Sequence, residues 1–246
     1  MLVKSQVKYI QSLSQKKVRD EERLFVAEGP KIINELLAAS NTSALQIYAV
    51  ENWINEQQQL LAKLEPAHIH IVSDSELERI SFQSSPNQVL GLFSKPVFPD
   101  GSILKGSISL VLDGIQDPGN LGTIIRSADW FGVNKIFASE DSADAFNPKV
   151  VQSTMASITR VNLIYGNLTE LIKSATIPVF AAVLEGKNLM ELPKIKEGLI
   201  VIGNESKGIR PSVLSGNYQP VTIPKKGTAE SLNAAVATGI ILSHLT

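Results

Sequence analysis

The chain has 246 residues, with 23 basic and 24 acidic side chains, a formal net charge of -1, and 43% hydrophobic residues. This composition is typical of a folded globular protein and excludes a disordered, collagen-like or strongly basic chain. Because there are no cysteines and only three histidines, disulfide frameworks and thiolate zinc sites are excluded, and a multi-histidine metal site is not expected.

The N-terminal segment gives no sign of export or of a membrane anchor. It lacks the apolar core of a secretory signal, and no stretch approaches the roughly 18 apolar residues of a membrane span. We therefore expect a cytoplasmic protein that acts without a membrane. Residues 1–19 carry basic and no acidic side chains, which predicts a solvated helix face, with a phosphate-facing arm as the alternative.

The first third of the sequence predicts a small α/β domain. A short strand from Phe25 and a turn at Glu28 and Gly29 precede a helix that begins with Pro30. Further strands are predicted at 45–50, 69–72 and 89–93, and helices around 53–64 and 75–80. Prolines and glycines without periodicity follow. They place a domain at 1–98 and a linker at 99–106.

Residues 107–246 predict a second and more regular α/β domain. Strands are predicted at 108–113, 135–139, 161–164, 178–184, 199–203 and 218–223. Helices are predicted at 121–131, at 148–158, from about 168 and from 232. Apolar strands that alternate with helices indicate a mostly parallel sheet covered on both faces. Such sheets bind ligands at the carboxyl ends of their strands.

The loop after the first strand of this domain leads into a helix with one basic residue. Asn120 is expected to cap that helix. Helical side chains slant toward the N-terminus, so Arg126 lies over Gly122, which has no side chain to block it, and can reach the loop. The alternative is an exposed arginine paired with Asp129 three residues later.

Two further loops follow apolar strands in the same domain. Gly203 and Gly208 bracket four polar residues, whose backbone amides could meet a ligand or simply connect a strand to a helix. After Pro224, Ser231 is expected to cap the last helix and Asn233 to expose its amide, although a plain helix cap would give the same pattern. No G-x-G-x-x-G follows a strand, which disfavours a nicotinamide-binding Rossmann site.

These three segments resemble the three motifs of the SpoU (TrmH) family of RNA 2'-O-ribose methyltransferases, of the SPOUT class. The first motif, N-x-G-x(3)-R, is matched by Asn120, Gly122 and Arg126. The second, G-N-E-x-x-G, is matched by Gly203, Asn204, Glu205 and Gly208. The third, I-P…S-L-N, is matched by Ile223, Pro224, Ser231, Leu232 and Asn233. The N-terminal part is similar to the family's L30e-like substrate-binding domain through FVAEGPKIINELL and SSPNQVLGLFSKP.

The resemblance implies an α/β fold with a deep trefoil knot in a mostly parallel SPOUT sheet domain. It also implies S-adenosyl-L-methionine as cofactor, a homodimer, and structured RNA as substrate, with ribosomal RNA preferred to transfer RNA. DNA is not expected, because it lacks the 2'-hydroxyl. The alternatives are a transfer RNA 2'-O-methyltransferase and a non-catalytic RNA-binding or ribosome-assembly protein of the same fold.

The resemblance further assigns roles to single residues. It places Arg126 at the 2'-hydroxyl, where the family's proposed mechanism makes it the general base. Because arginine normally stays protonated, we instead expect Arg126 to bind the adjacent phosphate or the developing alkoxide. The residues that would orient it or the target nucleotide are Asn120, Glu205, Ser231 and Asn233. Those that would hold the cofactor are Leu184, Gly203, Asn204, Ile223 and Leu232. Trp53 and Trp130 are expected to be packing residues rather than base-stacking platforms.

Overall fold

The computed structural model describes residues 2–99 and 105–246, which form two compact units. One unit comprises the chain up to Phe98 together with Phe146–Thr159, and the other comprises the residues from Pro99 to Ala145 together with Arg160–Thr246. Residues 100–104 of the predicted linker lie outside the described residues. Within the part of the chain that is described, no helix is long and apolar enough to cross a bilayer.

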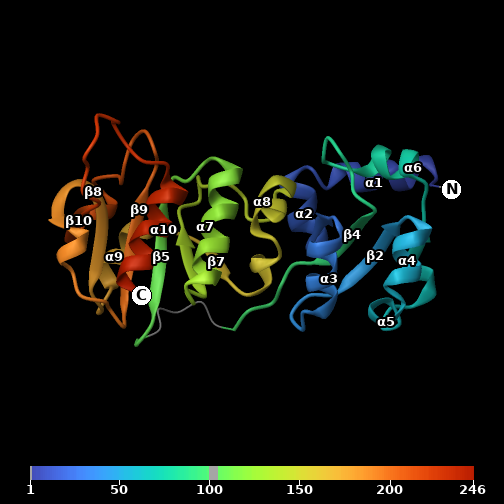
Figure 1. The fold of residues 1–246 in the computed structure, drawn as a ribbon, viewed down its shortest axis with the longest axis horizontal. Helices are drawn as coiled ribbons and strands as arrows, with labels where there is room; N and C mark the ends of the chain where they lie inside the picture. The colour runs from blue at the N-terminus through green and yellow to red at the C-terminus, as the bar shows by residue number, and fades with distance from the viewer. Residues whose placement is uncertain (1, 100–104) are drawn as a thin grey trace. The chain divides into compact units, whose positions relative to one another are not determined.

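The first unit is built on a four-stranded sheet in the order β1-β4-β2-β3. Figure 1 labels β2 and β4 of this sheet. Its strands are β1 (Leu24–Glu28), β2 (Ala44–Ala49), β3 (Ile69–Ile71) and β4 (Val89–Ser94). β4 is antiparallel to both β1 and β2, whereas β2 and β3 are parallel. All four strands were predicted from the sequence, and the structure confirms them to within one or two residues.

Six helices surround this sheet. They are α1 (Lys4–Ser12), α2 (Lys16–Glu22), α3 (Pro30–Ala38), α4 (Glu51–Glu56), α5 (Gln58–Leu61) and α6 (Asp74–Ile80). α3 begins with Pro30 as predicted, but the single helix expected around 53–64 is two short helices. The lysines of the basic N-terminal run are exposed, whereas Arg19 is buried and donates from Nη1 to the carbonyl oxygens of Leu13 and Ser14, each at 2.7 Å.

A segment from the second half of the sequence completes the first unit. Helix α8 (Pro148–Thr154) lies against β1, and the Phe146 ring is 5.3 Å from the ring of Phe25. Asn41 Nδ2 also donates to the carbonyl of Thr159 at 2.9 Å. The helix predicted at 148–158 ends early, because Met155 and Ala156 adopt left-handed backbone conformations. The domain limits 1–98 and 107–246 stay a prediction, to which the structure adds this exchanged segment.

The second unit contains a six-stranded sheet in the order β10-β8-β9-β5-β6-β7, and all of its pairings are parallel. The strands are β5 (Ile108–Asp113), β6 (Lys135–Ala138), β7 (Asn162–Tyr165), β8 (Val179–Asn188), β9 (Gly198–Gly203) and β10 (Gln219–Thr222). This confirms the predicted parallel sheet. β8 runs four residues beyond its predicted end, because Lys187 and Asn188 pair with β10.

Helices cover the central strands of this sheet, β5 and β9, which are almost entirely buried. α7 (Pro118–Trp130) and α10 (Ala234–Leu245) pack side by side (Figure 1), while α9 (Leu168–Ser174) shares a buried apolar cluster with Val111 and Phe137. Leu110 and Leu112, which alternate with Val111 on β5, are buried as well. The centre of the sheet is therefore mostly apolar, whereas β7 is half-buried and the end of β8 is exposed. The trefoil knot stays an implication of the sequence resemblance.

Candidate active site

The first motif lies between the end of β5 and the first turn of α7. Asp117, not Asn120, caps α7: its Oδ1 accepts the backbone N–H of Asn120 at 2.8 Å, and Pro118 is the first helical residue. The prediction of Asn120 as the cap is therefore wrong. A carboxylate three residues upstream satisfies that N–H, which leaves the side-chain amide of Asn120 available for contacts with other loops.

The side chain of Asn120 joins all three motif loops. Its Nδ2 donates to Glu205 Oε1 at 2.5 Å, and its Oδ1 accepts from Asn233 Nδ2 at 2.8 Å. Each of these two bonds joins residues more than 80 positions apart in the sequence, and together they form one hydrogen-bonded chain. The structure brings together these three of the residues to which the motifs pointed.

Asn233 has a second function as the cap of α10. Its Oδ1 accepts the backbone N–H groups of Ala235 and Val236 at 2.9 and 3.2 Å, so α10 begins at Ala234. The prediction that Ser231 caps this helix is wrong, because Asn233 already occupies the capping position. Ser231 is exposed and has no hydrogen-bond partner among the described residues.

The second motif folds into a tight loop that only glycine permits at its start. A Cβ added to Gly203 would lie 2.3 Å from the backbone carbon of Gly208, so the chain passes where a side chain would be. Asn204 and Gly208 exchange backbone hydrogen bonds at 3.1 and 2.9 Å. Asn204 also donates from Nδ2 to the carbonyl of Gly114 at 2.8 Å. The Asn204 side chain therefore shapes the loop that presents Glu205.

An ion pair that was not predicted from the sequence holds the C-terminal end of this loop, at Arg210. Asp113 is buried and accepts both the backbone N–H and the Nε–H of Arg210, each at 2.7 Å. Arg210 also pairs with Asp141 at 3.2 Å. The hydrogen bond with Asp113 raises the pKa of Arg210, and a hydrogen bond from Ser139, followed by the charge of Arg210, lowers the pKa of Asp141. The only signal in the sequence was an aspartate at the end of an apolar strand.

Arg126 is not part of the hydrogen-bonded chain. It lies six residues after Asn120, which corresponds to about 9 Å along the helix axis and roughly 240° around it. It is exposed and has no ion-pair or hydrogen-bond partner among the described residues. The alternative pairing with Asp129 is wrong, because Asp129 accepts from Nε of Arg160 at 2.8 Å. The guanidinium of Arg126 is thus available to a partner outside this chain.

The residues assigned to the cofactor fit a nucleoside-like ligand. Leu184 and Leu232 are large apolar side chains with exposed fractions of 76% and 45%, and Ile223 is half-buried after the end of β10. Thr222 Oγ1 donates to the carbonyl of Leu184 at 3.0 Å, which ties β8 to this end of β10. Exposed apolar groups next to backbone amides and carbonyls are suited to the adenine and ribose of S-adenosylmethionine. The residues present therefore fit the cofactor that the motifs imply.

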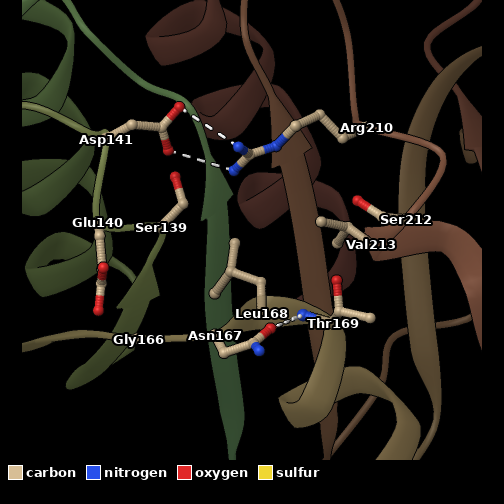
Figure 2. A pocket seen from close by; sticks show the side chains of 10 residues that line it. All are labelled: Ser139, Glu140, Asp141, Gly166, Asn167, Leu168, Thr169, Arg210, Ser212 and Val213. Atoms are coloured by element: carbon tan, nitrogen blue, oxygen red, sulfur yellow. Dashed lines mark hydrogen bonds and ion pairs between the residues drawn. The ribbon is translucent and has the colours of Figure 1, made fainter.

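A separate pocket of about 510 Å³ is lined in part by Arg210. Figure 2 shows the guanidinium of Arg210 directed at Asp141, with Asn167 bonded to the first turn of α9 below it. Leu168 and Val213 supply its apolar lining. None of the residues assigned above to catalysis or to the cofactor lines this pocket, so it is distinct from the motif cluster.

Comparison with known families decides the identity of the fold. Residues 107–243 match the SpoU rRNA Methylase family, and residues 4–91 match a family described as the MRM3-like substrate binding domain. The chain belongs to the SpoU rRNA methylase family. It is an S-adenosylmethionine-dependent RNA 2'-O-methyltransferase with an N-terminal substrate-binding domain, as the motifs predicted.

Relatives of this SpoU methylase resemble it over nearly the whole chain. The 23S rRNA (guanosine(2553)-2'-O)-methyltransferase RlmP of Bacillus subtilis is 28% identical, over 97% of this chain and 95% of its own. The 23S rRNA (guanosine-2'-O-)-methyltransferase RlmB of Coxiella burnetii is 28% identical, over 87% and 92%. The AdoMet-bound rRNA methyltransferase of Sinorhizobium meliloti is 30% identical over 100% and 95% of the two chains, with a TM-score of 0.86.

Proposed function

We propose that this SpoU methylase transfers a methyl group to the ribose 2'-hydroxyl of a guanosine in 23S ribosomal RNA, and that it does so in the cytoplasm. Relatives that align over nearly their full length are named for this nucleotide and this RNA. The structural observation that carries the proposal is the hydrogen-bonded chain Asn233–Asn120–Glu205, which joins the three motifs at the carboxyl edge of the sheet. A ligand at this edge would contact all three loops.

The chemistry requires more positioning than proton abstraction. The sulfonium of S-adenosylmethionine supplies an electrophilic methyl group, whereas a ribose hydroxyl is a weak nucleophile at neutral pH. Holding two reactants in attack geometry supplies about 7 to 11 kcal/mol of the barrier. Glu205, Asn120 and Asn233 provide a fixed row of polar groups for that purpose. Their mutual hydrogen bonds keep them in place before the RNA arrives.

Arg126 supplies the positive charge in this proposal. Its guanidinium stays protonated and stabilises the developing alkoxide or the phosphate beside it. Its side chain is exposed and has no partner in the described part of the chain, which is suited to a group that meets the RNA. Ser231, which is also exposed and unbonded among the described residues, would contact the same nucleotide.

The test is Arg126→Ala, with transfer of labelled methyl groups to ribosomal RNA and cofactor affinity both measured. Loss of one charge-stabilising group is expected to lower the transfer rate by about 10² to 10³, with cofactor affinity unchanged. Lys173→Ala, which removes an exposed cation from α9 outside the motif loops, is the matched control and should transfer normally. Near-normal transfer by Arg126→Ala would contradict the assignment.

We also propose that the enzyme is a homodimer formed through α10. This helix is apolar on nearly all sides, but only one side is buried against the rest of its own chain. The uncovered stripe consists of the exposed Val236 and Ser243 and the half-buried Gly239 and Ile240, whose spacing places them along one face. Met190 lies beside this stripe and is also exposed. A second copy that presents the same stripe would cover both.

A further inference from the structure

Trp130 is the last residue of α7 and its side chain stands in solvent. Its exposed fraction is 83%, whereas that of Trp53 is 1%. The prediction that both tryptophans are packing residues is therefore right for Trp53 and wrong for Trp130. An exposed indole contributes nothing to the core of its own chain, and tryptophan is enriched where proteins contact a partner.

A cationic side chain shares the face of α7 on which Trp130 lies. Arg126 lies four residues earlier, so its side chain is on the same face of α7, about 6 Å away along the axis. Asp129, the acidic residue next to Trp130 in sequence, is paired with the exposed Arg160 at 2.8 Å. The end of α7 thus presents an exposed aromatic ring about one helical turn from the guanidinium of Arg126, while the neighbouring carboxylate of Asp129 is already paired with Arg160.

We propose that Trp130 is a stacking platform for an unpaired base of the RNA substrate, beside the nucleotide whose ribose or phosphate meets Arg126. Single-stranded RNA is bound by aromatic rings that stack on bases and by cations that contact the backbone, and this face offers both. One helical turn between the two side chains lets one or two nucleotides contact both. The inference rests on the proposed function, because it takes Arg126 to be the residue that meets the RNA.

The charge of this face favours RNA over a second protein copy. In a two-fold interface the same patch meets itself, and the carboxylate of this patch, Asp129, is already paired with Arg160, so burial of Arg126 there would be costly. The uncovered stripe of α10, by contrast, carries no charge and suits a second copy. An anionic partner with exposed bases satisfies both the guanidinium of Arg126 and the indole of Trp130.

The test uses the fluorescence of the two tryptophans in the full-length protein. Titration with a short single-stranded RNA of mixed sequence should quench the wild type. Trp130→Phe, in which only the buried Trp53 emits, should bind the same RNA without quenching. Trp130→Leu keeps an apolar side chain but cannot stack. It should weaken RNA binding by on the order of 10-fold and raise the KM for RNA, with cofactor affinity unchanged.

Several results would overturn the inference. Unquenched wild-type emission at saturating RNA, or wild-type RNA affinity in Trp130→Leu, would remove the stacking role. A shift of Trp130→Leu from dimer to monomer in sedimentation, with RNA affinity per site unchanged, would assign this face to a second copy instead. Failure of the proposed function is distinguishable, since the wild type would then bind and quench with RNA but transfer no methyl group, which would leave the stacking supported.

Discussion

Asp113 fixes the end of the loop that presents Glu205. The buried carboxylate accepts two hydrogen bonds from Arg210, one from its backbone and one from its side chain. In Asp113→Asn the amide presents N–H groups to one of these donors, so one hydrogen bond is lost and the charge of Arg210 keeps only Asp141. We expect the free energy of unfolding, measured by urea denaturation, to fall by about 1–3 kcal/mol and the methyl-transfer rate to fall with it.

Asp141→Asn is the matched control for this substitution. It removes the other carboxylate of the same arginine, but the Asp141 side chain is 50% exposed, so water replaces most of the interaction. Its effect on stability should stay within about 1 kcal/mol. Equal effects of the two substitutions on stability and on transfer would show that burial of Asp113 does not hold the loop.

At the residue scale, the sequence predicted which loops meet but not every contact within them. Asn120, Glu205 and Asn233 were identified from motif spacing, and they do bond to one another. The partner of Asp129 was predicted from helix spacing alone and is instead Arg160, 31 positions away. Such contacts depend on which elements pack together, and spacing within one helix carries no information about that.

At the scale of elements, Asn233 combines two functions that one substitution can separate. Its Oδ1 caps α10, and its Nδ2 donates to Asn120. Asn233→Asp keeps an oxygen for the cap but replaces the donor with a second acceptor. We expect helix content and stability to stay within about 0.5 kcal/mol of the wild type, because Asp and Asn are equivalent caps. Methyl transfer should fall by at least 10-fold, because the row of polar groups loses its donor.

Asn233→Ala, which removes both functions, completes this comparison. It should lose about 1 kcal/mol of stability together with the transfer activity. Circular dichroism, thermal unfolding and transfer of labelled methyl groups measure the three quantities. Normal transfer by Asn233→Asp would mean that the bond to Asn120 serves only to hold the fold.

The elements themselves were more predictable than their ends. Runs of apolar residues predicted the central strands of the parallel sheet, because a strand that is buried on both faces is apolar at nearly every position. Both helix starts in the motif loops were displaced by two or three residues, since Asp117 and Asn233 take the capping positions predicted for Asn120 and Ser231. Several residues in each loop could cap, and backbone geometry decides among them.

At the scale of the whole molecule, the least predictable feature was which segments of the chain form the first unit. Phe146–Thr159 belongs to it although the segment follows two strands of the second unit in sequence. The helix pattern of 148–154 says only that one face is apolar. This face packs against β1, and Phe146 contacts Phe25. Such tertiary contacts cannot be predicted from the local sequence pattern.

The proposed homodimer gives a prediction at the same scale. Ile240 lies in the middle of the uncovered stripe of α10, so Ile240→Asp would place a charge without a partner at the centre of a two-fold interface. Sedimentation should show a dimer for the wild type and a monomer for the variant, with an unchanged circular dichroism spectrum. Val97→Asp, at an exposed apolar residue of the first unit, is the matched control and should remain a dimer. A wild-type monomer, or a dimer that survives Ile240→Asp, would contradict the assignment of this stripe to a second copy.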